Sequence, residues 1–125
     1  MHEIIFYHDK NGYEPVNAYI EELHAQKDKN SRIKYEKIMA YIDILSEKGT
    51  TAGEPYMKHL DGEIWELRPL RDRIFFAAWI DNTFILLHHF MKKTQKTPKD
   101  EIEKAKRELE NFKKEKKNNG IQKRI

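Results

Sequence analysis

The sequence predicts an α+β fold: a single compact domain in which helices pack on one face of an antiparallel sheet of about four strands. Three observations support this class. A chain of 125 residues suits one domain. Three short segments rich in Ile, Phe and Trp follow one another closely between residues 64 and 90. Segments with apolar residues at helical spacing lie on both sides of them, so the expected order is β-α-α-β-β-β-α.

The N-terminal part of the chain predicts one strand and two helices. Residues 3–8 form the strand, and Asn11-Gly12 breaks it. Pro15 suits the first position of a helix, and Gly49 suits the end of the second one. Apolar residues recur at spacings of three and four in both helices, which the polar stretch 26–31 separates: Val16, Tyr19, Ile20 and Leu23, then Tyr35, Ile38, Ile42 and Leu45.

The middle of the chain predicts three consecutive strands after a turn-rich loop over residues 50–62. The strands span residues 64–68, 73–80 and 83–90. Residues 69–72 make the first turn between them, and Asp81-Asn82 makes a two-residue second turn. Strands joined by such short connections pair antiparallel.

A last helix closes the predicted domain. Thr97 is a good N-cap and Pro98 suits the first helical position. The apolar stripe of this helix consists of Ile102, Ala105, Leu109 and Phe112. Apolar periodicity ends there, so we predict a domain over residues 1–112 and a basic, flexible tail over residues 113–125.

The predicted turns set a register that sorts side chains onto the two faces of the sheet. Ile80 is placed opposite Thr83, and Arg68 opposite Arg73. One face is apolar and is expected to meet the helices: Trp65, Leu67, Ile74, Phe76, Ala78, Ile80, Ile85 and Leu87. The other is expected to stay partly open and mixes aromatic with charged residues: Glu66, Arg68, Arg73, Phe75, Trp79, Phe84, Leu86, His88 and Phe90.

The open face and the segment that follows it are basic. Residues 64–99 contain seven Lys and Arg residues but only three Asp and Glu residues. Two arginines on neighbouring strands repel each other, so an anionic partner between them is expected, and aromatic rings beside cations suit RNA. Three alternatives stay open: a solvated basic surface, pairing of Arg68 with Glu66 or Asp72, and a structural role for His88.

Several kinds of chemistry find no support in the sequence. There is no cysteine, no glycine-rich phosphate loop, no HExxH motif and no serine in a nucleophile elbow. We therefore predict no cofactor and no metal site. No stretch approaches the length of a signal-peptide core or a membrane span, so we expect a cytoplasmic protein with no membrane partner.

Two stretches carry a family resemblance: GEIWELRPLRDRIFFAAW, and LLHHFMKKTQKTP with its closing helix. They resemble the HigB branch of the RelE/ParE toxin superfamily, a phage-derived toxin–antitoxin family. The resemblance implies a RelE-like domain and a ribosome-dependent endoribonuclease that cleaves mRNA and halts translation. It also implies a HigA-like helix-turn-helix antitoxin, bound in a higher-order complex on operator DNA.

The resemblance also implies a set of site residues. Arg68, Arg73, Lys92 and Lys93 fall on the family's basic, RNA-facing set, and His88 matches the histidine that closes the last strand. These five are the predicted catalytic residues. Contacts to RNA are expected from Lys96, Lys58 and Phe90.

A metal-independent mechanism fits these residues. The ribose 2′-OH attacks the adjacent phosphate, so the enzyme needs a base, an acid and cations for the extra charge of the phosphorane. We hypothesise that Arg73 and Arg68 bind the phosphate, that Lys92 or Lys93 moves protons, and that His88 is the alternative base. Two other functions stay open: a ParE-like toxin that acts on DNA gyrase without nuclease action, and a basic protein-binding module.

Overall fold

The computed structural model describes residues 1–124, and it describes side chains as far as Lys117. The elements are β1 (Glu3–Phe6), α1 (Pro15–Ala25), α2 (Lys29–Lys48), the short 3₁₀ helix η1 (Gly49–Ala52), β2 (Met57–Asp61), β3 (Ile64–Leu67), β4 (Asp72–Trp79), β5 (Thr83–Met91) and α3 (Lys99–Arg124). The α+β class is confirmed. Within the described residues, no helix has the length and apolar character that a membrane span requires.

The sheet differs from the prediction in two ways. It has five strands in the order β1-β5-β4-β3-β2, and β1 runs parallel to β5 whereas the other neighbours are antiparallel. The additional strand, β2, lies in the segment predicted to be a loop. The sequence of β2 is mostly polar, and only Met57 is buried. Its strand conformation therefore depends on pairing with β3, and the residues of β2 alone do not predict that pairing.

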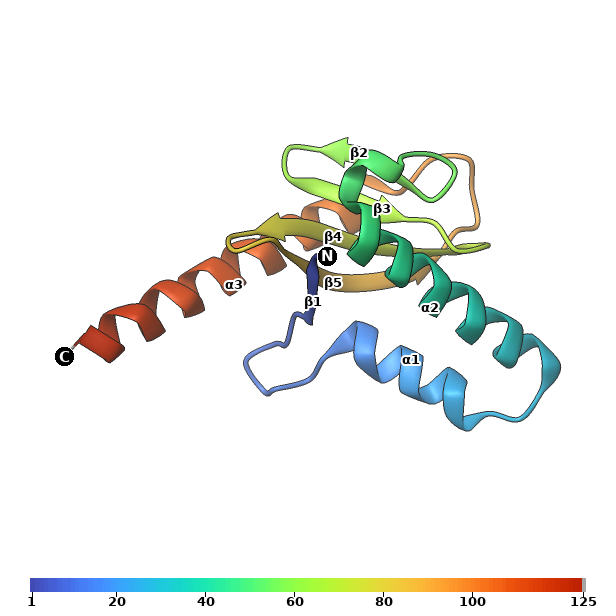
Figure 1. The fold of residues 1–125 in the computed structure, drawn as a ribbon, viewed down its shortest axis with the longest axis horizontal. Helices are drawn as coiled ribbons and strands as arrows, with labels where there is room; N and C mark the ends of the chain where they lie inside the picture. Colours follow the sequence, from blue (N-terminus) through green and yellow to red (C-terminus); the bar gives the residue numbers. More distant parts are fainter. Residues whose placement is uncertain (125) are drawn as a thin grey trace.

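Helices cover both faces of the sheet, so the prediction of one open face is wrong. In Figure 1, α1 and α2 lie together on one side of the strands, whereas α3 begins beside the sheet and extends past it to the left. Two separate apolar cores form. The first joins α1 and α2 to Leu67, Ile74, Phe76, Phe84 and Leu86. The second joins the apolar stripe of α3 to Ile64, Phe75, Ala77, Ile85 and Leu87.

The register between β3 and β4 is the predicted one. Glu66 lies opposite Phe75 and Leu67 opposite Ile74, which continues to Arg68 opposite Arg73. Glu66, Arg73 and Phe75 therefore share a face, as expected from the four-residue turn. This face is the one that α3 covers over part of its area.

The register between β4 and β5 is shifted by one residue near their turn. Trp79, not Ile80, lies opposite Thr83, because three residues make the turn and Asp81 and Asn82 both adopt positive φ. An irregularity between Ile74 and Phe76 then restores the predicted pairing, with Arg73 opposite Phe90. The predicted faces were therefore wrong for the apolar part of β5: Phe84, Ile85, Leu86 and Leu87.

Helix α3 differs from the prediction at both ends. It begins at Lys99, and the Thr97 hydroxyl donates to Glu66 rather than capping the helix. It continues into the predicted tail, where Lys113 pairs with Glu63 at 2.6 Å and Glu115 lies 3.2 Å from His8. Residue 125 and the side chains after Lys117 lie outside the described part of the chain, and a domain boundary at Phe112 stays a prediction.

Candidate functional site

Basic side chains from three parts of the chain gather at one end of the sheet and line two adjoining hollows. The first hollow has a volume of about 430 Å³ and is lined by Arg71, Arg73, Lys92, Lys93, Thr94 and Gln95. The second has about 310 Å³ and is lined by Lys58, His59, Leu60, Glu66, Arg68, Lys92, Gln95, Lys96, Thr97 and Ile102. They share Lys92 and Gln95. The structure thus brings together the predicted residues Arg68, Arg73, Lys92, Lys93, Lys96 and Lys58, which we call the basic cluster.

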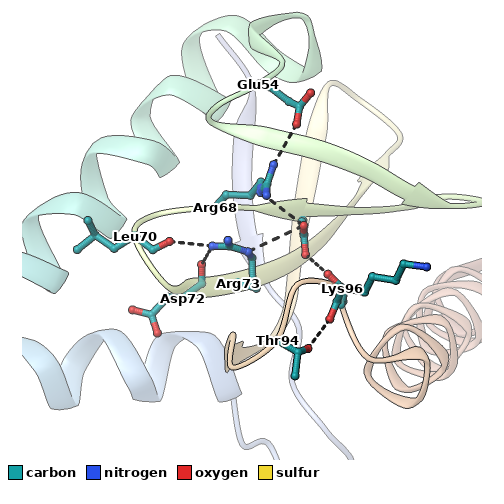
Figure 2. Close-up of polar contacts among 9 residues, drawn as sticks. Glu54, Arg68, Leu70, Asp72, Arg73, Thr94 and Lys96 are labelled. Carbon is teal, nitrogen blue, oxygen red and sulfur yellow. Dashed lines mark hydrogen bonds and ion pairs between the residues drawn. The ribbon is translucent and has the colours of Figure 1, made fainter.

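Arg73 is the most fixed member of the basic cluster. Its side chain is only 8% exposed, and Nη1 donates to the carbonyl oxygens of Leu70 and Asp72, each at 2.9 Å. Burial lowers the pKa of the guanidinium, and the opposing charge of Glu66 offsets only part of that shift. Figure 2 shows how this guanidinium lies beside the turn that contains Leu70. The Arg73 guanidinium is therefore a cation that two backbone carbonyls hold in place at the edge of the first hollow.

Arg68 is paired with carboxylates, as the alternative interpretation proposed. Its Nε lies 3.6 Å from Glu66 Oε2, and its Nη1 donates to Glu54 Oε1 at 3.0 Å. Glu54 is 66% exposed, so this second contact is open to solvent and is weak. Figure 2 shows the contact between Arg68 and Glu54.

Glu66 is a residue of the site that the sequence-based hypothesis did not assign a role. Its side chain is 3% exposed. Oε1 accepts a hydrogen bond from Thr97 Oγ1 at 2.8 Å, and Oε2 lies 4.0 Å from Arg73 Nε. The predicted face alternation placed Glu66 beside both arginines, which was the signal that could have identified it.

The lysines of the basic cluster are more accessible than the arginines. Lys92 is half-buried, whereas Lys93, Lys96 and Lys58 are exposed. Among the described residues, none of these four lysines forms an ion pair. They are therefore available to an anionic ligand. In Figure 2, the Lys96 side chain points away from the arginines.

Two of the predicted site residues line neither hollow of the basic cluster: His88 and Phe90. The prediction that His88 lines an open face is wrong, because α3 covers it and leaves it 2% exposed. Its Nδ1 lies 2.5 Å from Glu108 Oε1 and its Nε2 lies 3.1 Å from Glu101 Oε1. Phe90 is half-buried, and its ring stacks on that of Phe75 at 5.5 Å. Both contribute to the packing of the α3 face.

The chemistry of this arrangement is that of an anion site. A guanidinium held in place, together with several lysines that form no ion pair among the described residues, suits phosphate oxygens and the charge that builds up during phosphoryl transfer. Within the described part of the chain, no three His, Asp or Glu side chains are grouped so that they would hold a metal ion.

Comparison with known proteins identifies the family. Residues 21–110 match the family described as phage derived protein Gp49-like (DUF891). The match spans more than half of the chain, and the chain belongs to this family, which is a RelE/HigB-type toxin family. Membership of the HigB branch itself stays a prediction.

The comparison with solved structures is weaker. The chain is similar to the crystal structure of the archaeal RelE–RelB complex from Pyrococcus horikoshii OT3, at 16% identity and a TM-score of 0.49, covering 72% of this chain and 93% of that one. No curated protein matches the sequence.

Proposed function

We propose that this protein is the toxin of a type II toxin–antitoxin system and acts as a ribosome-dependent endoribonuclease that cleaves mRNA. The basic cluster is the observation that supports this proposal. Its first hollow is lined by two arginines, two lysines and two uncharged polar residues, with no acid among them. Such a lining suits the phosphate of an RNA strand, whereas an apolar or acidic lining would oppose it.

The proposed reaction is an internal transesterification. The ribose 2′-OH loses its proton to a base and attacks the adjacent phosphorus, which forms a P–O bond and a phosphorane. The bond to the 5′-oxygen then breaks as that oxygen accepts a proton. The products are a 2′,3′-cyclic phosphate and a free 5′-hydroxyl. No metal or cofactor takes part in these steps.

The side chains divide this work by their accessibility. Arg73 is held in place and buried, so it is suited to stabilise the extra negative charge of the phosphorane without reorganisation. Arg68 adds a second cation beside it. Lys92 and Lys93 line the same hollow as Arg73 and are the candidates for moving protons. We assign His88 no proton transfer, because both of its ring nitrogens already face glutamates.

The proposal implies two kinds of partner. The ribosome supplies and orients the mRNA, which places the protein in the cytoplasm. A cognate antitoxin, HigA-like and of the helix-turn-helix type, neutralises the toxin and holds it in a complex on operator DNA. The exposed lysines of the basic cluster are suited to an acidic segment of such a partner.

Induced expression followed by primer extension on cellular messages tests the proposal. The wild type should arrest growth and produce new 5′ ends in translated messages. Arg73→Ala and Lys93→Ala should each reduce cleavage by at least about a hundredfold, the usual scale for losing a transition-state cation. Lys114→Ala is the matched control, because Lys114 is an exposed cation on α3 that lines neither hollow.

Two results would contradict the nuclease assignment. The first is growth arrest by both variants with no new 5′ ends in the wild type. The second is toxicity that only a resistant gyrase relieves, which would favour the ParE-like alternative. An absence of toxicity would favour a basic protein-binding module instead.

A further inference from the structure

We propose that Glu66 is a positioning residue: its buried carboxylate holds Arg68, Arg73 and the lysine-bearing loop of residues 92–97 in one arrangement around the substrate phosphate. This inference rests on the proposed nuclease function and deepens it. Glu66 belongs to β3 and Arg68 directly follows that strand. Arg73 belongs to β4, and the loop follows β5. One carboxylate therefore links three separate segments of the site.

The burial of Glu66 calls for a specific role. A carboxylate that is only 3% exposed is costly unless charged or polar partners surround it. Glu66 has such partners on both oxygens: Thr97 on Oε1, and Arg68 and Arg73 on Oε2. Because both oxygens already face protein groups, we assign Glu66 no direct contact with the reacting atoms.

Glu66 offsets the repulsion between two adjacent arginines without consuming their donors. Its Oε2 lies 3.6 Å from Arg68 Nε and 4.0 Å from Arg73 Nε. The second distance is too long for a hydrogen bond, and Arg73 Nε is buried with no hydrogen-bond partner. The carboxylate thus neutralises part of the local charge without a hydrogen bond to either arginine Nε.

The same carboxylate anchors the far end of the lysine-bearing loop. At its start, the Lys92 amide donates to the carbonyl of Arg71 at 2.8 Å. At its end, the Thr97 hydroxyl donates to Glu66 at 2.8 Å. Within the loop itself, the Thr94 hydroxyl donates to the backbone carbonyl of Lys96 at 2.8 Å. Among the described contacts, the Thr97–Glu66 bond is the side-chain hydrogen bond that ties the end of this loop to the sheet, so it limits the positions that the loop and its lysines can adopt relative to Arg73.

Cleavage of a short message on purified, programmed ribosomes tests the inference with full-length protein. Glu66→Gln preserves the shape of the side chain and can still accept from Thr97, but removes the charge that the arginines share. Its kcat should fall by about tenfold or more while KM does not rise, because the loss concerns orientation rather than attraction for RNA.

Two variants at Thr97 test the anchor separately. Thr97→Val removes the hydroxyl at nearly constant volume and should lower kcat by about three- to tenfold through looser placement of the lysines. Thr97→Ser restores the donor and should recover most of the lost rate. Glu63→Gln is the charge-matched control, because Glu63 is an exposed glutamate in the β2–β3 turn that pairs with Lys113.

The outcomes separate this inference from the proposed function. If the wild type cleaves and Glu66→Gln and Thr97→Val cleave at the wild-type rate, the positioning role is wrong and the nuclease assignment stands. The positioning role is also wrong if the fall in the cleavage rate of each variant only matches its fraction of unfolded protein, measured by urea unfolding. If the wild type makes no cut on programmed ribosomes, the nuclease assignment fails and the inference fails with it.

Discussion

His88 and His89 are consecutive residues of β5 with opposite environments. His88 faces α3, where both ring nitrogens lie near glutamate oxygens of Glu101 and Glu108. His89 faces α1, where its ring stacks on Tyr19 at 4.0 Å and its buried Nδ1 has no hydrogen-bond partner. The comparison shows that the α3 face holds its histidine through polar contacts with two glutamates of the helix, whereas the α1 face holds a histidine by ring packing alone.

The polar groups on the α1 face adjoin the basic cluster. Tyr19 OH donates to Asp72 Oδ1 at 2.9 Å, and Asp72 Oδ2 is buried without a partner. Burial raises the pKa of Tyr19 well above its usual range, and the charge of Asp72 raises it further. The backbone carbonyl of Asp72 accepts from Arg73. The α1 face thus carries two buried atoms without a hydrogen-bond partner, Asp72 Oδ2 and His89 Nδ1, and Asp72 connects them to Arg73 of the candidate site.

The largest effect is expected on the α3 face. His88→Leu leaves the carboxylates of Glu101 and Glu108 without their shared partner beneath α3. Removing the partner of two largely buried carboxylates should lower the free energy of unfolding by about 3 kcal/mol in urea denaturation. A loss below about 1 kcal/mol would mean that the contacts do not hold α3.

A smaller effect is expected from the tyrosine on the α1 face. Tyr19→Phe keeps the stacked ring but leaves both Asp72 oxygens without a donor. The free energy of unfolding should fall by about 1–2 kcal/mol, the cost of a buried acceptor that loses its hydrogen bond. Tyr13→Phe is the matched control, since Tyr13 is 58% exposed and should show no change. Equal stability of the two variants would contradict the role given to the Tyr19–Asp72 bond.

The smallest effect concerns His89 and depends on pH. Burial lowers the pKa of His89 below its ordinary value of 6.5, against the opposing charge of Asp72. The unfolded chain therefore binds a proton more readily than the folded one. This contribution to stability is fully present above about pH 6.5 and is lost as the pH falls from there toward the lowered pKa of the folded state.

His89→Phe tests that dependence. It preserves a ring against Tyr19 and removes the unpartnered nitrogen, so the stability near pH 8 should stay within about 1 kcal/mol of the wild type. Urea unfolding from about pH 8 to about pH 5 should show a shallower decline for the variant than for the wild type. Parallel curves would show that His89 does not contribute to the pH dependence.

The parts of the fold that were predictable depend on neighbours in the sequence. The β3–β4 register followed from a short turn and from alternation, and it placed Glu66 and Arg73 on one face as observed. The β4–β5 faces were not predictable in the same way, because a three-residue turn and an irregularity near Phe76 each displace the alternation by one residue. Such displacements depend on how the strands pair and not on either strand alone.

The sequence by itself determined the α+β class, the amphipathic helices and the collection of cations on either side of β5, since periodicity and turn chemistry are local. Only the tertiary structure decided that α3 covers the second face, that His88 pairs beneath it, and that Glu66 and Thr97 meet across the site. The reason is physical: partners for buried polar groups come from distant segments, and which segment supplies them depends on the packing of the whole chain.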